Sequence, residues 1–264
     1  MEVVSIRLFE GPNIYSLHPV AKIVLDIGAY REKPSNMLEG FTDRLLAVLP
    51  GLRDHHCSRG RPGGFVERLR EGTYLAHIFE HVLLELQCLA GFEVSFGKAR
   101  STPVPGVYDV IVSFREGAVA VKAVEIAQKL LLAILDKQPF DVTRAIAALK
   151  EAGEKAALGP STAAICQAAK ARGIPVSRLE QENLLILGYG RRQQRVWATI
   201  SGLTSALGSD LASDKHLTKQ LLSRGGIPVP EGFVVEDLAG ATAAWQALDC
   251  PVVVKPLTGN HGKG

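Results

Sequence analysis

Residues 251–264 read PVVVKPLTGNHGKG, a short β-branched run that passes directly into a segment rich in glycine. The run predicts a buried strand that ends at Lys255. Gly259, Gly262 and Gly264 follow, and glycine lets backbone N–H groups approach phosphate oxygens because it has no Cβ. The segment therefore predicts a phosphate-binding loop beside a cation. A flexible surface hairpin is the alternative for such a loop taken alone.

The residues before this loop alternate helical and strand patterns. Helices are predicted for STAAICQAAKARG, SDKHLTKQLLSRGG and LAGATAAWQALD, and strands for NLLILG and GFVV. This order is typical of an α/β fold that handles nucleotides. In the second helix Ser213 is the candidate N-cap, and Lys215 and Lys219 follow on one side. Those two lysines serve either a phosphate or only a solvated helix face.

Two better-known phosphate motifs do not fit. In 259–264 the visible lysine precedes the last glycine, so a Walker loop is unsupported. Gly188 and Gly190 follow a strand, but Gln193 stands where a dinucleotide fingerprint needs its third glycine. The sequence therefore predicts no NAD site.

The first part of the chain has a different pattern, which predicts a mixed α+β domain. A stretch rich in Gly, Ala and Pro at 153–160 marks the boundary, so the predicted domains are 1–158 and 159–264. Thr73 is the candidate N-cap of a long helix, and Gly91 its candidate C-cap. The other predicted elements are strands at 2–9, 22–28 and 108–114, and helices at 40–49, 63–72, 118–135 and after Asp141.

The long helix carries the segment HIFEH, an H-x-x-E-H pattern. His77 and His81, four residues apart, lie on one helix face within reach of one zinc ion, and Glu80 is placed to act as a general base. The pattern resembles the inverted zincin motif. In that class a glutamate from a later helix completes the ligand set, which implies Glu125, with Glu116 as second choice. The alternative is a pair of ordinary amphipathic-helix histidines.

Four arginines precede this helix in CSRGRPGGFVERLR: Arg59, Arg61, Arg68 and Arg70. A solvated basic face is one interpretation. A surface that binds a polymer bearing carboxylates is the other, because guanidinium groups pair with carboxylates in a bidentate manner.

Composition narrows the class of protein. The net charge of +3 is too small and too interleaved to predict a nucleic-acid or membrane surface. No basic leader or apolar span is present, and the cysteines form no C-x-x-C pair, which argues against a disulfide framework and a thiolate zinc site. We therefore expect a cytoplasmic protein with reduced thiols at Cys57, Cys88, Cys166 and Cys250.

The pattern D-K-x-x-x-K, followed by GIPVP and then VVVKP with its glycine-rich loop, resembles the ATP-grasp superfamily. Together with LLILGYGRRQQR, CSRGRPGGFVERLREGTYLAHIFEHVLLELQ and PFDVTRAI, it resembles the cyanophycin synthetase family over nearly the whole chain. By motif position the resemblance implies that Lys215 and Lys255 hold ATP phosphates. Gly259, Gly262 and Gly264 would lie in the loop that covers them.

The resemblance implies an ATP-dependent carboxylate-amine ligase. Such a ligase phosphorylates the carboxyl end of the polymer with ATP, and the amine of aspartate attacks the acyl phosphate. A Mur-ligase-like unit then adds arginine. The implied partners are cyanophycin polymer or primer, L-aspartate and L-arginine, in a homo-oligomer without nucleic acid. The magnesium ligands of ATP-grasp enzymes follow the loop, so we expect a truncated chain, inactive by itself.

Two further functions stay open. Some members of the family carry a metallopeptidase site in the first domain that trims polymer into primers, which implies zinc there. A module that only tethers polymer through the arginines is the other. A relative that joins preformed aspartate-arginine dipeptides is a further alternative for the ligase itself.

Overall fold

The computed structural model describes residues 1–179 and 183–258. The chain divides into two compact units, Met1–Leu158 and Gly159–Gly264. The division lies inside the stretch where the sequence predicts a boundary. Gly259, Gly262 and Gly264 of the predicted phosphate loop lie outside the described residues.

The first unit contains a four-stranded antiparallel sheet with the order β1-β2-β4-β3. Alternate residues of the central strands, such as Ile23 and Val112, are buried against helices. The other face carries polar pairs such as Lys22 with Asp109, 2.8 Å apart. This alternation is clearest in β2. The strands are β1 (Glu2–Phe9), β2 (Val20–Asp26), β3 (Gly97–Ser101) and β4 (Val107–Ser113), and only β3 was not predicted.

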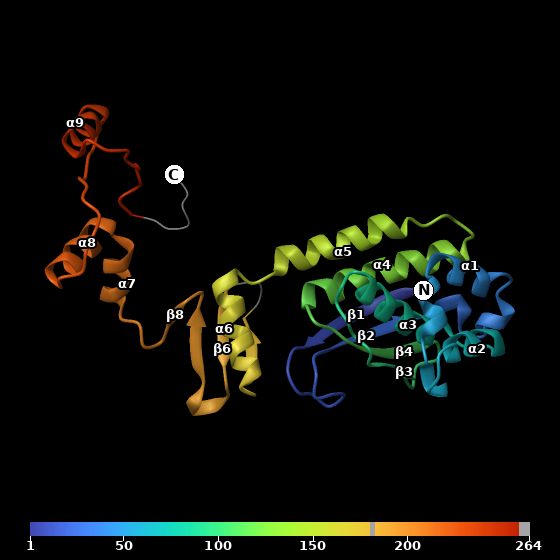
Figure 1. Ribbon diagram of the computed structural model, residues 1–264. Coiled ribbons are helices and arrows are strands. Elements are labelled where there is room, and N and C mark those ends of the chain that lie inside the picture. Colours follow the sequence, from blue (N-terminus) through green and yellow to red (C-terminus); the bar gives the residue numbers. More distant parts are fainter. Residues whose placement is uncertain (180–182, 259–264) are drawn as a thin grey trace. The chain divides into compact units, whose positions relative to one another are not determined.

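Helices cover the buried face of this sheet (Figure 1). Helices α3 and α4 pack on the sheet and on each other, and α5 packs on α4. The predicted mixed α and β character of this unit is confirmed. The helices are α1 (Phe41–Val48), α2 (Gly64–Glu71), α3 (Leu75–Leu89), α4 (Gly117–Leu135) and α5 (Val142–Ala156). Short 3-10 turns are η1 (Gly28–Tyr30), η2 (Ser35–Met37), η3 (Pro50–Asp54) and η4 (Cys57–Arg59).

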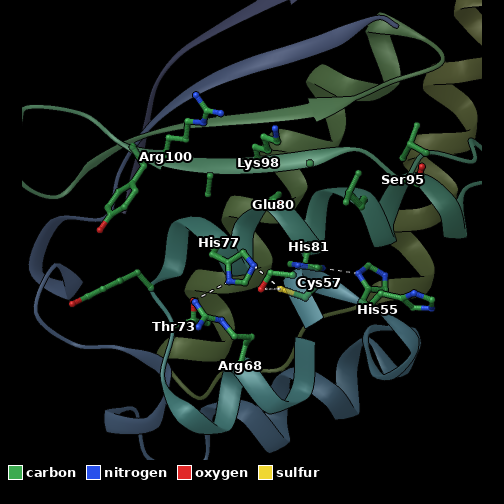
Figure 2. Close-up of a pocket in the computed structure, with 18 of the residues that line it drawn as sticks. His55, Cys57, Arg68, Thr73, His77, Glu80, His81, Ser95, Lys98 and Arg100 are labelled. Atoms are coloured by element: carbon green, nitrogen blue, oxygen red, sulfur yellow. Dashed lines mark hydrogen bonds between the residues drawn. The ribbon is translucent and has the colours of Figure 1, made fainter. Parts of the chain in front are cut away.

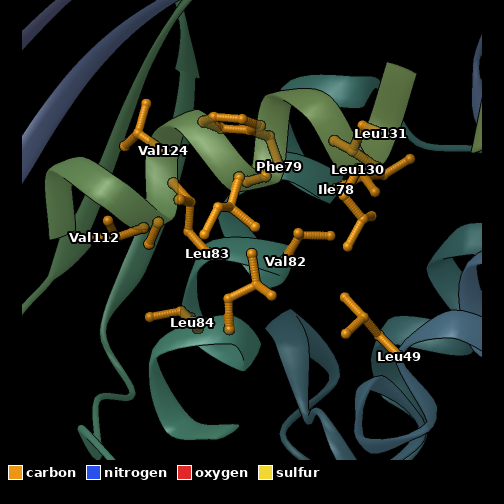
Figure 3. Close-up of a cluster of buried hydrophobic side chains, with 14 of the residues drawn as sticks. Leu49, Ile78, Phe79, Val82, Leu83, Leu84, Val112, Val124, Leu130 and Leu131 are labelled. Carbon is orange, nitrogen blue, oxygen red and sulfur yellow. The ribbon is translucent and has the colours of Figure 1, made fainter. Parts of the chain in front are cut away.

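Helix α3 is the central element of the core. Its apolar side chains, including Phe79, Val82 and Leu83, share one buried cluster with Leu130 and Leu131 of α4 (Figure 3). A helix that is apolar on nearly every side must be buried on nearly every side. The polar residues of α3 are therefore held rigidly in a packed environment.

The start of α3 differs from the prediction. Tyr74 is the N-cap and makes no side-chain capping bond. The Thr73 hydroxyl, predicted to cap the helix, lies 2.9 Å from Nδ1 of His77 instead. Gly91 follows the C-cap Ala90 in the left-handed region with φ 91°, as a helix-ending glycine often does.

The second unit contains an antiparallel sheet with the order β5-β6-β7-β8 and four helices within its described residues. Asp214, not the predicted Ser213, caps α8, because its carboxylate accepts hydrogen bonds from two backbone N–H groups. The elements are α6 (Pro160–Ala171), β5 (Val176–Arg178), β6 (Leu184–Leu187), η5 (Gly190–Arg192), β7 (Gln194–Trp197), β8 (Ile200–Ser201), α7 (Ala206–Ser213), α8 (Lys215–Arg224) and α9 (Leu238–Leu248).

Two predicted strands of this unit are not formed. Residues 232–235 and 251–255 have no strand structure, and Val253 and Val254 are 78% and 79% exposed. A β-branched run becomes a strand only when a second strand supplies its hydrogen bonds, and the part of the chain described here provides none. In the same described ranges, none of the helices has the length and apolarity needed to cross a membrane.

Candidate functional site

A cavity of about 1000 Å³ opens in the first unit above the polar side of α3. Its walls are α3, strand β3, and the segment that joins α1 to α2 (Figure 2). Both histidines and the glutamate of the H-x-x-E-H pattern line it. The structure therefore brings His77, Glu80 and His81 to one site.

The third member of the cluster is a cysteine. Sγ of Cys57, in η4, lies 3.2 Å from Nε2 of His77. Cys57, His77 and His81 each offer one donor atom, and these atoms lie within 4.8 Å of one another. Cys57 has φ 53°, a left-handed conformation that costs energy for a residue with a Cβ. The fold thus holds this thiol in a strained position beside the two imidazoles.

Hydrogen bonds on the far side of each ring fix which nitrogen faces the cluster. The Thr73 hydroxyl bonds Nδ1 of His77, which leaves Nε2 directed at Cys57. Nδ1 of His81 lies 2.8 Å from Nδ1 of His55, and Nε2 of His55 lies 3.0 Å from a carboxylate oxygen of Glu85.

The contacts from His81 through His55 to Glu85 determine which ring nitrogens carry protons. The Glu85 carboxylate can only accept, so His55 donates from Nε2 and accepts at Nδ1. His81 then donates from Nδ1, and its Nε2 keeps a free lone pair. Phe65 stacks on the His81 ring with centroids 3.9 Å apart and fixes its plane. Such outer contacts orient metal-ligating histidines in proteins.

Burial keeps both imidazoles neutral. Desolvation, with the nearby Arg68 cation, lowers the pKa of His77 to about 4. Desolvation, with His77 and His55, lowers the pKa of His81 to about 2. A neutral imidazole is the form that binds a metal ion, so neither histidine has to lose a proton before binding at neutral pH.

Burial also makes the charged form of Glu80 unfavourable, but for a carboxyl group this raises the pKa. Burial raises its pKa to about 7, and a hydrogen bond from the backbone of Ala99 in β3 offsets part of that effect. Gly97 allows this close approach, because a Cβ there would lie 2.6 Å from Oε1 of Glu80. A carboxyl group with a pKa near neutrality can both take and give a proton.

The donor set fits zinc. Thiolate and imidazole are both zinc ligands, and a catalytic zinc site has three protein ligands and an open fourth position. The polar contacts behind the imidazoles supply the outer shell that such a site requires. These residues fit the metal that the H-x-x-E-H pattern predicts.

Glu125, predicted as the third ligand, does not reach the cluster. It lies on the exposed side of α4, where Lys122 and Lys129 both bond its carboxylate and lower its pKa to about 2. Glu116, the second choice, is the N-cap of α4 and does not line the cavity either. Cys57 stands in their place. The cysteine pattern could not reveal it, because a single thiolate ligand needs no C-x-x-C pair.

The four arginines do not form one face. Arg59 pairs with Glu71, and Arg61 pairs with Glu67. Arg68 lines the cavity, whereas Arg70 is exposed on α2. Only Arg68 is therefore a member of the candidate site.

The predicted nucleotide site lies in the second unit. The backbone N–H of Lys215, at the first residue of α8, bonds the carbonyl of Leu257, and Asp214 forms a β-bridge with Thr258. Lys255 lies two residues before this contact and is exposed. The structure thus brings the start of α8 beside the segment that follows Lys255. Lys219 instead donates to the carbonyl of Gly232 at 3.1 Å.

The chain is similar to known proteins over both units. Residues 22–136, which contain the whole cluster, match the family described as Cyanophycin synthase-like N-terminal domain. The first unit is thus similar to a cyanophycin synthase-like N-terminal domain. The entire chain is 41% identical to the cyanophycin synthetases of Geminocystis herdmanii and Trichormus variabilis, and 40% identical to that of Synechocystis sp.. It spans 30% to 31% of the length of these relatives.

Proposed function

We propose that this protein is a cyanophycin synthetase, an ATP-dependent ligase that joins aspartate and arginine into polymer through acyl phosphates. The observation that carries the proposal is similarity over the whole chain to proteins of that name. The contact between the start of α8 and Leu257 supports it, because it places Lys215 near the segment that contains Lys255. Two ammonium groups there would stabilise the charge that moves during phosphoryl transfer.

The test uses the complete gene product with ATP, magnesium, L-aspartate, L-arginine and polymer primer. Lys215→Ala and Lys255→Ala should each raise the KM for ATP or lower kcat by at least about tenfold, measured as phosphate release. Lys170→Ala, an exposed lysine of α6, is the matched control. Equal activity in all three variants, or no polymer from the wild-type protein, would contradict the assignment.

The cavity of the first unit favours a second activity. We infer that Cys57, His77 and His81 hold zinc and that Glu80 serves as the proton carrier in hydrolysis of a peptide bond in the polymer. Zinc would supply a Lewis acid that polarises the scissile carbonyl. Near neutral pH, Glu80 accepts a proton from the attacking water at a carboxylate oxygen and then gives it to the leaving amine. The burial of Glu80 matters because it raises the pKa to about 7, so that the carboxylate and the carboxylic acid are both accessible near neutral pH.

Metal content and cleavage separate the roles of these residues. Cys57→Ala and His81→Ala should lose bound zinc, whereas Glu80→Gln should retain zinc and lose cleavage of polymer. Cys88→Ala is the control, because Cys88 also lines the cavity but its thiol donates to the carbonyl of Val94. If the protein binds no zinc and Glu80→Gln cleaves polymer at the wild-type rate, the hydrolase assignment fails.

A further inference from the structure

Strand β3 has a free edge, and that edge forms a wall of the cavity. β3 is at the end of its sheet and pairs only with β4 among the described residues. The carbonyl of Phe96 and the N–H of Thr102 both bond the β4 side. Backbone groups alternate in direction along a strand, so those of Gly97, Ala99 and Ser101 point outward. The N–H of Ala99 donates to Glu80, which agrees with this direction, so the outward groups open to another strand are the carbonyl of Ala99 and the groups of Gly97 and Ser101.

The free edge runs across the zinc-ligand cluster. Gly97 and Ala99 line the same cavity as His77 and His81. A strand added to a sheet lies about 4.8 Å from its neighbour. An extended peptide paired with β3 would therefore pass through the cavity, between β3 and the segment that contains Cys57. Main-chain hydrogen bonds give affinity in this mode of recognition, and side-chain contacts give specificity.

The charges of the cavity indicate what the peptide carries. Arg68 lines the cavity from α2, whereas Lys98 and Arg100 border it from the exposed face of β3. None of the three forms an ion pair within residues 1–179 and 183–258. Nε of Arg68 is buried and has no hydrogen-bond partner in the same residues. A buried donor without a partner costs free energy, which a carboxylate ligand would recover. Asp54 is a carboxylate on this wall that opposes them.

We propose that the free edge of β3 binds an extended peptide with carboxylate side chains as an added strand, and that Arg68, Lys98 and Arg100 select those carboxylates. The peptide lies across Cys57, His77 and His81. This inference names the binding mode of the substrate for the proposed hydrolase and rests on that function for its consequence. Binding itself requires no metal.

The test measures peptide binding by the complete protein carrying Glu80→Gln, with zinc removed by a chelator, so that cleavage cannot interfere. The probes are a fluorescent octa-aspartate peptide, two versions of it in which either the odd or the even amides are N-methylated, and octa-asparagine. N-methylation leaves the charge unchanged but removes strand pairing, so it should weaken binding at least about tenfold in one of the two alternating patterns. Octa-asparagine should bind at least about tenfold more weakly than octa-aspartate.

Two protein variants and one exchange measurement complete the design. Lys98→Ala with Arg100→Ala should weaken octa-aspartate binding about tenfold or more, whereas Lys122→Ala with Lys129→Ala, on α4, removes equal charge and should not. Amide exchange at Gly97 and Ser101 should slow when peptide is bound. Equal binding of both methylated peptides and the parent peptide, or equal effects of the two double variants, would overturn the proposal. Peptide binding without cleavage by the zinc-loaded wild-type protein would reject the hydrolase and leave the docking edge intact.

Discussion

Three buried groups of the metal-free first unit, His77, His81 and Glu80, change its stability in acid. The two histidines make the folded state less stable as the pH falls, and Glu80 has the opposite effect. The pKa of His77 is lowered to about 4 and that of His81 to about 2, so at pH 5 to 6 the unfolded chain binds two protons that the folded chain does not. Their stabilising contribution is complete above about pH 6.5 and is lost as the pH falls. The pKa of Glu80 is raised to about 7, so in this range the folded chain holds one proton that the unfolded chain releases.

The net difference is one proton, which changes the free energy of unfolding by about 1.4 kcal/mol per pH unit. The first unit should therefore become less stable by that amount for each unit of acidification between pH 6 and pH 5. Glu80→Gln removes the opposing term, so its slope should rise to about 2.7 kcal/mol per pH unit. Glu125→Gln is the control, because the pKa of Glu125 is lowered to about 2 and it stays charged throughout this range.

Native-state hydrogen exchange of the core amides of α3 measures the free energy of opening of the first unit alone. Tryptophan fluorescence cannot do so, because both tryptophans, Trp197 and Trp245, belong to the second unit. The exchange rates are corrected for the intrinsic effect of pH, and a chelator removes metal. If the wild-type protein and Glu80→Gln show the same slope, Glu80 is not protonated in the folded state. The proposed proton carrier would then lack the property that suits it to the role.

Three further outcomes are expected. His55→Phe removes the bond that orients His81 and should lower zinc affinity about 10-fold to 100-fold in competition with a chromophoric chelator, and unchanged affinity would show that the contact has no such role. Gly97→Ala places a Cβ 2.6 Å from Oε1 of Glu80, so cleavage of polymer should fall while bound zinc stays the same, and full cleavage would contradict the tight approach. Phe79→Ala should destabilise the first unit by about 3–5 kcal/mol in the exchange experiment, because the side chain is fully buried.

The sequence by itself determined the local elements of this protein. Long apolar runs with helical or strand character were strong enough to predict α3, α4, β2 and β4, because each of these elements buries apolar side chains in the core. The H-x-x-E-H spacing likewise placed the two histidines on one face, since residues four apart on a helix are neighbours. These results require only the geometry of a single element.

The tertiary structure decided everything that depends on residues distant in the chain. Cys57 precedes His77 by 20 positions, and only the fold, in which η4 packs on α2, brings its thiol to 3.2 Å from Nε2 of His77, so no local pattern distinguished it from Glu125. β3 carries Lys98 and Arg100 on its exposed side, and pairing with β4, rather than its own apolar pattern, makes it a strand. The three valines at 252–254 favour a strand by their own propensity but do not form one. Their propensity for a strand is high, but a strand forms only where another segment completes its hydrogen bonds.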